Sequence, residues 1–217
     1  MAVRAGSCLL LQFAREPVVG AVKTRMMPHL SAAEACDLHS ELVLWTTANL
    51  LHADLGRVEL VVAGASEHPL FARCREQGLA GIGYQRGADL GERMYNALAD
   101  GLRRYERVIL VGSDCPGIDR KYLHSAVGAL DRAEVVLGPA LDGGYVLVGA
   151  RRLHRDMFEG IAWGFDTVMA STRERLDGLA VEWVELPLQA DIDRPEDLPT
   201  WEALKRTGRV RWEVLRR

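Results

Sequence analysis

Residues 107–116 read Arg-Val-Ile-Leu-Val-Gly-Ser-Asp-Cys-Pro, an apolar run that leads directly into a glycine, a carboxylate and a proline. An unbroken series of Val, Ile and Leu is typical of a strand that is covered on both faces. Pro116 cannot continue the strand's hydrogen bonding, so Asp114 is predicted to stand just past the strand's carboxyl end. Six further apolar runs are predicted to be strands of the same kind: residues 8–13, 58–63, 82–85, 134–137, 145–148 and 181–186.

Helical segments with recognisable start signals separate several of these runs. Ser31 and Glu34 form a capping box before a long amphipathic stretch, and Asp89 and Asp119 stand at two further starts. Pro195 suits the first turn of a last helix that runs to about residue 206. Alternation of strands and helices predicts a three-layer α/β/α sandwich with a mainly parallel mixed sheet. Residues 142–186 interrupt strict alternation, since two strands follow each other closely, and a subregion over one end of the sheet is an open alternative for this part. We expect residues 1–217 to form a single domain with its core at about 8–206.

The composition excludes several function classes. Hydrophobic residues make up 48% and charged residues 26%, and 27 Lys and Arg against 30 Asp and Glu give a net charge of −3. A broad basic surface for nucleic acid is therefore not expected. No apolar run is long enough to span a bilayer, and residues 1–25 lack a signal-peptide pattern. The cysteines stand singly, at positions 8, 36, 74 and 115, which disfavours a disulfide framework or zinc site and predicts a cytoplasmic protein.

Two segments that follow predicted strands carry candidate chemistry. After the first strand, Pro17 and Gly20 shape a loop from which Lys23 and Arg25 project, an arrangement that suits a polyphosphate. The alternative is a solvated loop whose cations pair with carboxylates. Asp114 can hold Mg²⁺ or Mn²⁺ at the sheet edge. Capping of the next helix is its alternative role, although Asp119 is better placed for that.

Two further segments are ambiguous when taken alone. Residues 138–145, Gly-Pro-Ala-Leu-Asp-Gly-Gly-Tyr, form either a hairpin turn or a close backbone approach to a ligand. Asp191 and Asp193 lie on one side of an extended segment, or they favour the N-terminus of the following helix. The six histidines show no metal-ligand spacing, and we expect each to be an ordinary surface or helix residue.

Six segments in this order resemble the motif series of a bacterial family of GT-A-type glycosyltransferase-like proteins, which includes the glycosyltransferases of arsenosugar biosynthesis. The matching segments are residues 17–25, 89–94, 112–116, 138–145, 163–168 and 191–198. The resemblance is more distant to the guanylyltransferases of molybdenum cofactor and 2-phospho-lactate metabolism. The chain departs from the pattern at Gln12 and Arg15, and at Arg194, where the family has Thr.

The resemblance implies a nucleotide-diphosphosugar transferase fold and the following site residues. Nucleotide and phosphate contacts are implied for Pro17, Gly20, Lys23, Arg25, Asp89, Leu90, Gly91 and Arg93. Metal ligation is implied for Asp114 and Asp193, and contacts to the sugar or acceptor for Gly143, Gly144 and Trp163. The implied catalytic residues are Lys23, which would stabilise the leaving diphosphate, and Asp142, which would be the base.

Three functions remain open from the sequence. The first is a metal-dependent glycosyltransferase that takes a nucleotide-sugar donor, a small-molecule acceptor and Mg²⁺ or Mn²⁺. The second is a nucleotidyltransferase that acts on a phosphorylated small molecule. The third is a non-catalytic nucleotide-binding protein, which Arg194 keeps open. Expected partners are small molecules, with no nucleic acid and no membrane span, and a homodimer is an open alternative to a monomer.

Overall fold

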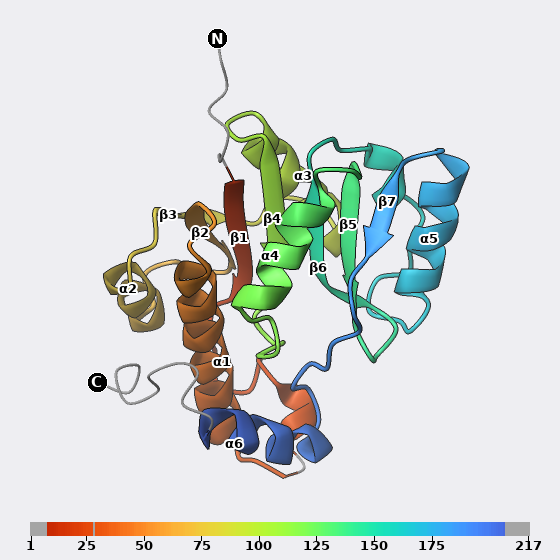
Figure 1. Ribbon diagram of the computed structural model, residues 1–217. Coiled ribbons are helices and arrows are strands. Elements are labelled where there is room, and N and C mark those ends of the chain that lie inside the picture. The colour runs from red at the N-terminus through yellow and green to blue at the C-terminus, as the bar shows by residue number, and fades with distance from the viewer. Residues whose placement is uncertain (1–7, 28, 207–217) are drawn as a thin grey trace.

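One seven-stranded sheet organises the computed structural model, which describes residues 8–27 and 29–206 (Figure 1). The strands lie in the order β3-β2-β1-β4-β6-β5-β7. Their bounds are β1 Cys8–Arg15, β2 Arg57–Ala63, β3 Gly81–Tyr84, β4 Arg107–Val111, β5 Val135–Pro139, β6 Tyr145–Ala150 and β7 Trp183–Glu185. All neighbouring pairs are parallel except those of β6, which runs antiparallel to β4 and β5. The predicted α/β fold with a mainly parallel mixed sheet is therefore confirmed, and all seven predicted strands are present.

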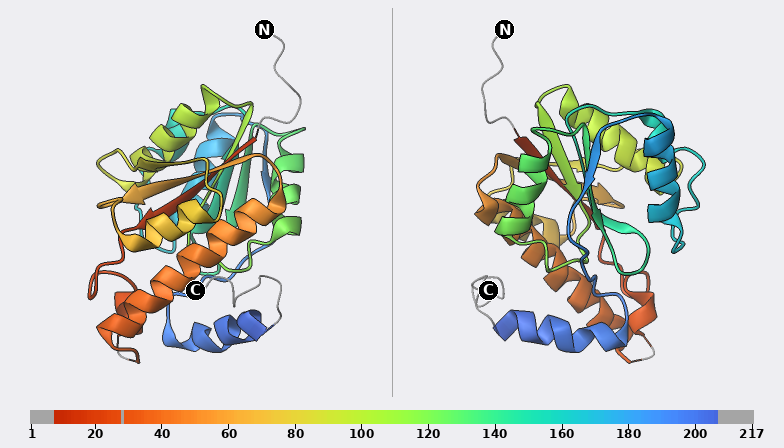
Figure 2. Two further views of the ribbon diagram at one scale, coloured as in Figure 1. Left: turned by 90° about the vertical axis from the view of Figure 1, so that its left-hand side faces the viewer. Right: turned by 45° about the vertical axis from the view of Figure 1, so that its right-hand side comes forward.

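Helices cover both faces of this sheet (Figure 2). Their bounds are α1 Ala32–Ala53, α2 Pro69–Glu76, α3 Leu90–Leu102, α4 Arg120–Ala129, α5 Val168–Gly178 and α6 Leu198–Arg206, with 3-10 turns η1 Thr24–Met26, η2 Arg155–Phe158 and η3 Pro195–Asp197. One face packs on α1, α2 and α4, and the other packs on α3, η2 and α5. Adjacent residues of a strand alternate between the faces: Leu10 and Ile109 contact the first group of helices, whereas Leu9 and Val108 contact the second.

The helix starts follow the predicted capping chemistry. The Ser31 hydroxyl accepts a hydrogen bond from the Glu34 backbone, and Asp89 and Asp119 each cap their helix by accepting from a backbone N–H of the first turn. The expected last helix begins as η3 at Pro195 and continues as α6 to Arg206. Helices α2 and α5 were not expected from the sequence.

The last helix, α6, packs across the N-terminal half of α1, beyond the carboxyl ends of β1 and β4 (Figure 1). Trp201 of α6 is 1% exposed and meets Trp45 of α1 edge to face, with 5.1 Å between ring centroids. Met26 of η1 lies in the same apolar cluster. Because α6 follows directly after residues 191–197, this cluster fixes that acidic segment against the loop that carries Lys23 and Arg25.

Two expectations concern other parts of the chain. No helix within residues 8–27 and 29–206 has both the length and the apolar character that crossing a membrane needs. A solvated tail or added edge strand over residues 210–217 was also expected, but those residues lie outside the described part of the chain.

Candidate functional site

A cavity of about 500 Å³ opens at the carboxyl edge of the sheet, between the end of β1, the loop before η1, the start of α3 and the loop after β4. This volume is in the range of small-molecule sites. Its charged lining consists of four cations and two carboxylates: Arg15, Lys23, Arg25, Arg93, Asp114 and Asp193. The lining therefore carries an excess of positive charge, although the whole chain is slightly acidic.

Asp114 follows β4 and is held by a buried polar network beneath it. The Ser113 hydroxyl donates to the Phe13 carbonyl over 2.7 Å and accepts from Gln12 Nε2 over 3.0 Å. The Thr46 hydroxyl on α1 donates to the Ser113 carbonyl over 3.2 Å. Gln12 is fully buried, and its remaining amide hydrogen bonds join it to α1. Gln12, one of the departures from the family pattern, thus anchors the Asp114 loop to β1 and α1.

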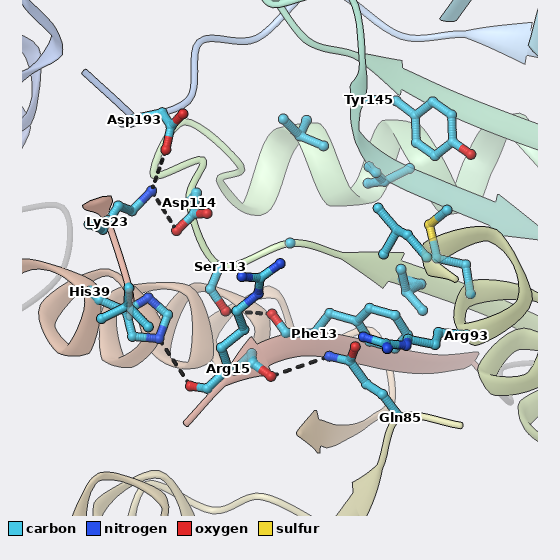
Figure 3. Close-up of a pocket in the computed structure, with 18 of the residues that line it drawn as sticks. Phe13, Arg15, Lys23, His39, Gln85, Arg93, Ser113, Asp114, Tyr145 and Asp193 are labelled. Atoms are coloured by element: carbon cyan, nitrogen blue, oxygen red, sulfur yellow. Dashed lines mark hydrogen bonds and ion pairs between the residues drawn. The ribbon is translucent and has the colours of Figure 1, made fainter. Parts of the chain in front are cut away.

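Lys23 brings Asp114 and Asp193 together, although the two carboxylates stand on different loops (Figure 3). Lys23 Nζ lies 2.9 Å from Asp114 Oδ1 and 3.5 Å from Asp193 Oδ1, and it donates to the Ile192 carbonyl over 2.6 Å. Arg25 Nη1 lies 2.6 Å from Asp193 Oδ2. The predicted phosphate-binding cations and the predicted metal-binding carboxylates therefore meet at one point of the cavity.

The surroundings of one Asp114 oxygen indicate whether these residues suit a divalent cation. Oδ1 is buried and accepts no hydrogen bond, because Lys23 lies at ion-pair distance but outside hydrogen-bond geometry. The Asp114 side chain is nevertheless 47% exposed, so the carboxylate remains open to the cavity. Within the described residues, no cluster of three or more His, Cys, Asp or Glu side chains could hold a metal. The pair fits Mg²⁺ in its usual protein setting, where one or two carboxylates bind it and substrate phosphates complete its shell.

The loop after β1 takes its shape from Pro17 and Gly20. Pro17 is buried, and a backbone hydrogen bond from Ala21 to the Val18 carbonyl closes a turn around Gly20, whose φ is +82°. Such a φ favours glycine. Neither Pro17 nor Gly20 lines the cavity, whereas residues 21–25 do. Both residues shape the course of the loop, and their contact with a nucleotide or phosphate stays a prediction.

The start of α3 and the segment around Trp163 interlock. The Cβ of any residue at position 91 would stand 2.5 Å from the Trp163 ring, so Gly91 leaves room for that ring. Leu90 and Arg93 line the cavity, while Asp89 is occupied as the helix cap. Trp163 is half-buried and packs on Tyr145 and Phe158, and it is not part of the cavity lining. A role for Trp163 as a wall for the sugar stays a prediction.

Residues 142–144 form the hairpin turn between β5 and β6. Asp142 Oδ1 accepts from the Gly144 backbone over 3.0 Å, and the Gly143 carbonyl accepts from Met169 at the start of α5. A Cβ at Gly143 would stand 2.0 Å from the Asp166 carbonyl oxygen. This turn does not line the cavity, so the predicted base and acceptor roles of Asp142, Gly143 and Gly144 stay predictions.

Asp191 is the acidic neighbour of this turn. Burial raises the pKa of Asp191, and the charges of Asp142 and Asp193 raise it further. Arg194, where the family has Thr, is exposed. The Asp197 carboxylate accepts from the backbone N–H groups of both Asp193 and Arg194, which fixes the segment without the Arg194 side chain.

Arg15, His39 and Gln85 are among the lining residues that were not assigned to the cavity from the sequence. The Gln85 amide nitrogen donates to the carbonyls of Ala14 and Val61, so its oxygen is left as an acceptor (Figure 3). His39 is 5% exposed, and its Nε2 lies 3.0 Å from the Arg15 carbonyl, which can only accept. These contacts join segments that are 24 to 71 residues apart in the sequence, so no local sequence motif predicts them.

His39 is predicted to make stability depend on pH. Burial lowers the pKa of His39 below its ordinary value. Between the pKa of the folded state and that of the unfolded state, the unfolded chain is therefore protonated at His39 while the folded chain is not. This contribution to stability is complete above the unfolded pKa and falls as the pH drops below about 6.5. Urea unfolding at pH 7.5 and 5.5 is expected to show a smaller loss of stability on acidification for His39→Gln than for the wild type. His52→Gln, at an exposed position of the same helix, is the control, and an unchanged pH dependence in His39→Gln would contradict the assignment.

Comparison with known proteins places the chain in a family. Residues 46–165 match the family model described as "Uncharacterized protein conserved in bacteria (DUF2064)". The chain belongs to this family. No curated protein matches it.

Solved structures share the fold of this DUF2064 member. A candidate nucleotide-diphospho-sugar transferase from Desulfovibrio desulfuricans G20 is 30% identical, with a TM-score of 0.78 over 86% of this chain and 82% of that one. A nucleotidyl transferase from Methanothermobacter thermautotrophicus is 15% identical (TM-score 0.61, 94% and 100% covered). A cytidylyltransferase from Leptospira borgpetersenii is 13% identical (TM-score 0.59, 91% and 86% covered). The fold is that of the nucleotide-diphosphosugar transferases.

Proposed function

We propose that this DUF2064 protein is a metal-dependent transferase that takes a nucleoside-diphosphate sugar as donor and passes the sugar to a small-molecule acceptor. The observation that carries the proposal is the cavity at the carboxyl edge of the sheet, where four cations and two carboxylates converge. In open α/β sheets, ligands bind at this edge. The match to the nucleotide-diphospho-sugar transferase candidate of Desulfovibrio desulfuricans supports the same donor class.

The proposed chemistry is a displacement at the sugar carbon. The acceptor hydroxyl forms a bond to that carbon, the bond to the diphosphate oxygen breaks, and the nucleoside diphosphate leaves with the electron pair. The phosphates are bound by the four cations of the cavity lining, Arg15, Lys23, Arg25 and Arg93. These hydrogen-bond donors are already in place, so they need no reorganisation as negative charge develops on the leaving diphosphate. Asp114 and Asp193 would hold a divalent cation, which would supply further charge neutralisation on the leaving diphosphate. Asp142 is the proposed acceptor of the hydroxyl proton.

A thermal-shift panel tests the donor class directly. Purified protein is heated with nucleoside mono-, di- and triphosphates and with nucleotide sugars, each with and without Mn²⁺. Ligands that bind the folded state raise the melting temperature by mass action, and at 100 times Kd the stabilisation is about 2.7 kcal/mol. We expect the largest Mn²⁺-dependent increase from one nucleoside-diphosphate sugar.

Two outcomes would replace this proposal. Stabilisation by triphosphates alone would favour a nucleotidyltransferase, and the absence of any metal-dependent response would exclude both enzyme functions. Arg93→Met is the informative variant, since this half-buried side chain lines the cavity without contacting either carboxylate in an ion pair. Lys121→Met on the exposed surface of α4 is its matched control for the loss of one positive charge.

A further inference from the structure

Lys23 holds an unusual backbone conformation for a lysine. Its φ of +50° and ψ of +39° place it in the left-handed region, directly before η1. A residue with a side chain adopts this conformation at an energetic cost, because its Cβ then crowds the following carbonyl oxygen. The Lys23 side chain is only 3% exposed. A strained backbone conformation at Lys23 thus accompanies the burial of its ammonium group at the edge of the cavity.

Three oxygens surround this ammonium, one through a hydrogen bond and two through ion pairs. These are the Ile192 carbonyl at 2.6 Å, Asp114 Oδ1 at 2.9 Å and Asp193 Oδ1 at 3.5 Å. Figure 3 shows Nζ between the two carboxylates. In this arrangement the charge of Lys23 is paired with both carboxylates and not with a phosphate.

The same two carboxylates are the proposed metal ligands. An ammonium and a divalent cation that share the same carboxylate oxygens stand close together and repel each other. Both cannot therefore occupy the space between Asp114 and Asp193. When no diphosphate is bound, the two carboxylates are already paired with Lys23 and Arg25. A metal that bound there alone would displace the Lys23 ammonium and leave it buried without an anionic partner.

We propose that Lys23 is an internal counter-ion that a divalent cation must displace, so that the metal binds together with a diphosphate and not before it. The diphosphate provides a new anionic partner for the released ammonium and completes the ligand shell of the metal. The inference rests on the proposed function for the identity of the metal ligands. By linkage, metal and diphosphate each raise the affinity for the other, and Lys23 carries part of this coupling.

Arg25 provides the matched comparison. Its guanidinium also pairs with Asp193, at 2.6 Å, but its side chain is 58% exposed and reaches only that carboxylate. Solvent screens such an exposed pair. Loss of Arg25 therefore removes one positive charge near the site without vacating the point between the carboxylates.

Mn²⁺ titration followed by electron paramagnetic resonance, with no nucleotide present, tests the inference on wild type, Lys23→Met and Arg25→Met. We expect Lys23→Met to bind Mn²⁺ at least tenfold more tightly than the wild type, and Arg25→Met to gain clearly less. An affinity of Lys23→Met within twofold of the wild type would overturn the inference. An equal gain in both variants would overturn it too, because general electrostatics would then explain the effect.

A second measurement covers the case in which Lys23→Met fails to fold. The ¹³Cε resonance of Lys23 in the labelled wild-type protein reports on its ammonium. It should move on addition of Mg²⁺ with inorganic pyrophosphate, and stay in place with Mg²⁺ alone. Movement of the resonance with Mg²⁺ alone contradicts the inference. A resonance that stays in place after both additions contradicts it too. Neither experiment contains a nucleotide sugar, so the two proposals can fail separately. If no nucleotide sugar stabilises the protein but these two experiments give the expected results, only the proposed donor is refuted.

Discussion

Replacement of Asp114 by Asn is expected to reduce metal-stimulated turnover at least about 100-fold and to abolish the metal-dependent part of nucleotide binding. The side chain is 47% exposed at the cavity, and its buried oxygen has Lys23 as its charged neighbour. Asn keeps the shape but loses the negative charge, and a neutral amide is a poor ligand for a hard cation with so few protein ligands. The buried bonds of Ser113 beneath it remain, so the fold is expected to persist.

Binding calorimetry with the best ligand of the donor panel, with and without Mn²⁺, measures the effect. Asp37→Asn, on the exposed side of α1, is the control for the loss of one carboxylate. Circular dichroism establishes whether the fold of each variant is intact. Metal-stimulated binding that survives in a folded Asp114→Asn protein would show that the metal assignment is wrong.

Trp201→Ala is expected to cost about 3–5 kcal/mol of unfolding free energy, the largest stability effect that we predict for one side chain. Trp201 is almost fully buried against Trp45, and its indole nitrogen lies 3.4 Å from Glu41 Oε2. Truncation leaves a cavity between α6 and α1. Since α6 fixes the segment that contains Asp193, the variant should also weaken nucleotide binding.

Urea unfolding measures this loss, and Trp201→Phe is the control because it retains an aromatic ring against Trp45. We expect Trp201→Phe to lose clearly less stability than Trp201→Ala. A change below about 1 kcal/mol in Trp201→Ala would mean that α6 does not depend on this contact, and the proposed link between α6 and the acidic segment would fail.

Much of the fold was predictable because its signals are local. The apolar runs mark all seven strands, and a side-chain cap at Ser31, Asp89 or Asp119 marks the start of a helix. Helix α5 escaped prediction because Thr167 provides no side-chain cap, and α2 because it is short and polar on average. Its only start signal, Pro69 after His68, is easily read as a turn.

The site was predictable only in part. Lys23, Asp114 and Asp193 follow strands or precede a helix, and the topology brings such positions to one edge. The sequence does not indicate that Lys23 bridges the two carboxylates, because this depends on a left-handed backbone and on packing of α6. Nor does it reveal His39 and Gln85, whose roles rest on long-range hydrogen bonds to backbone carbonyls.

The central claim is that the cavity binds a nucleoside-diphosphate sugar together with a divalent cation. Calorimetric titration of the wild-type protein with such sugars, in the presence of Mn²⁺ and in its absence, tests it most directly. The account predicts that at least one nucleotide sugar binds, and binds at least tenfold more tightly with Mn²⁺. Absence of binding for every nucleoside-diphosphate sugar, with and without the metal, would contradict it.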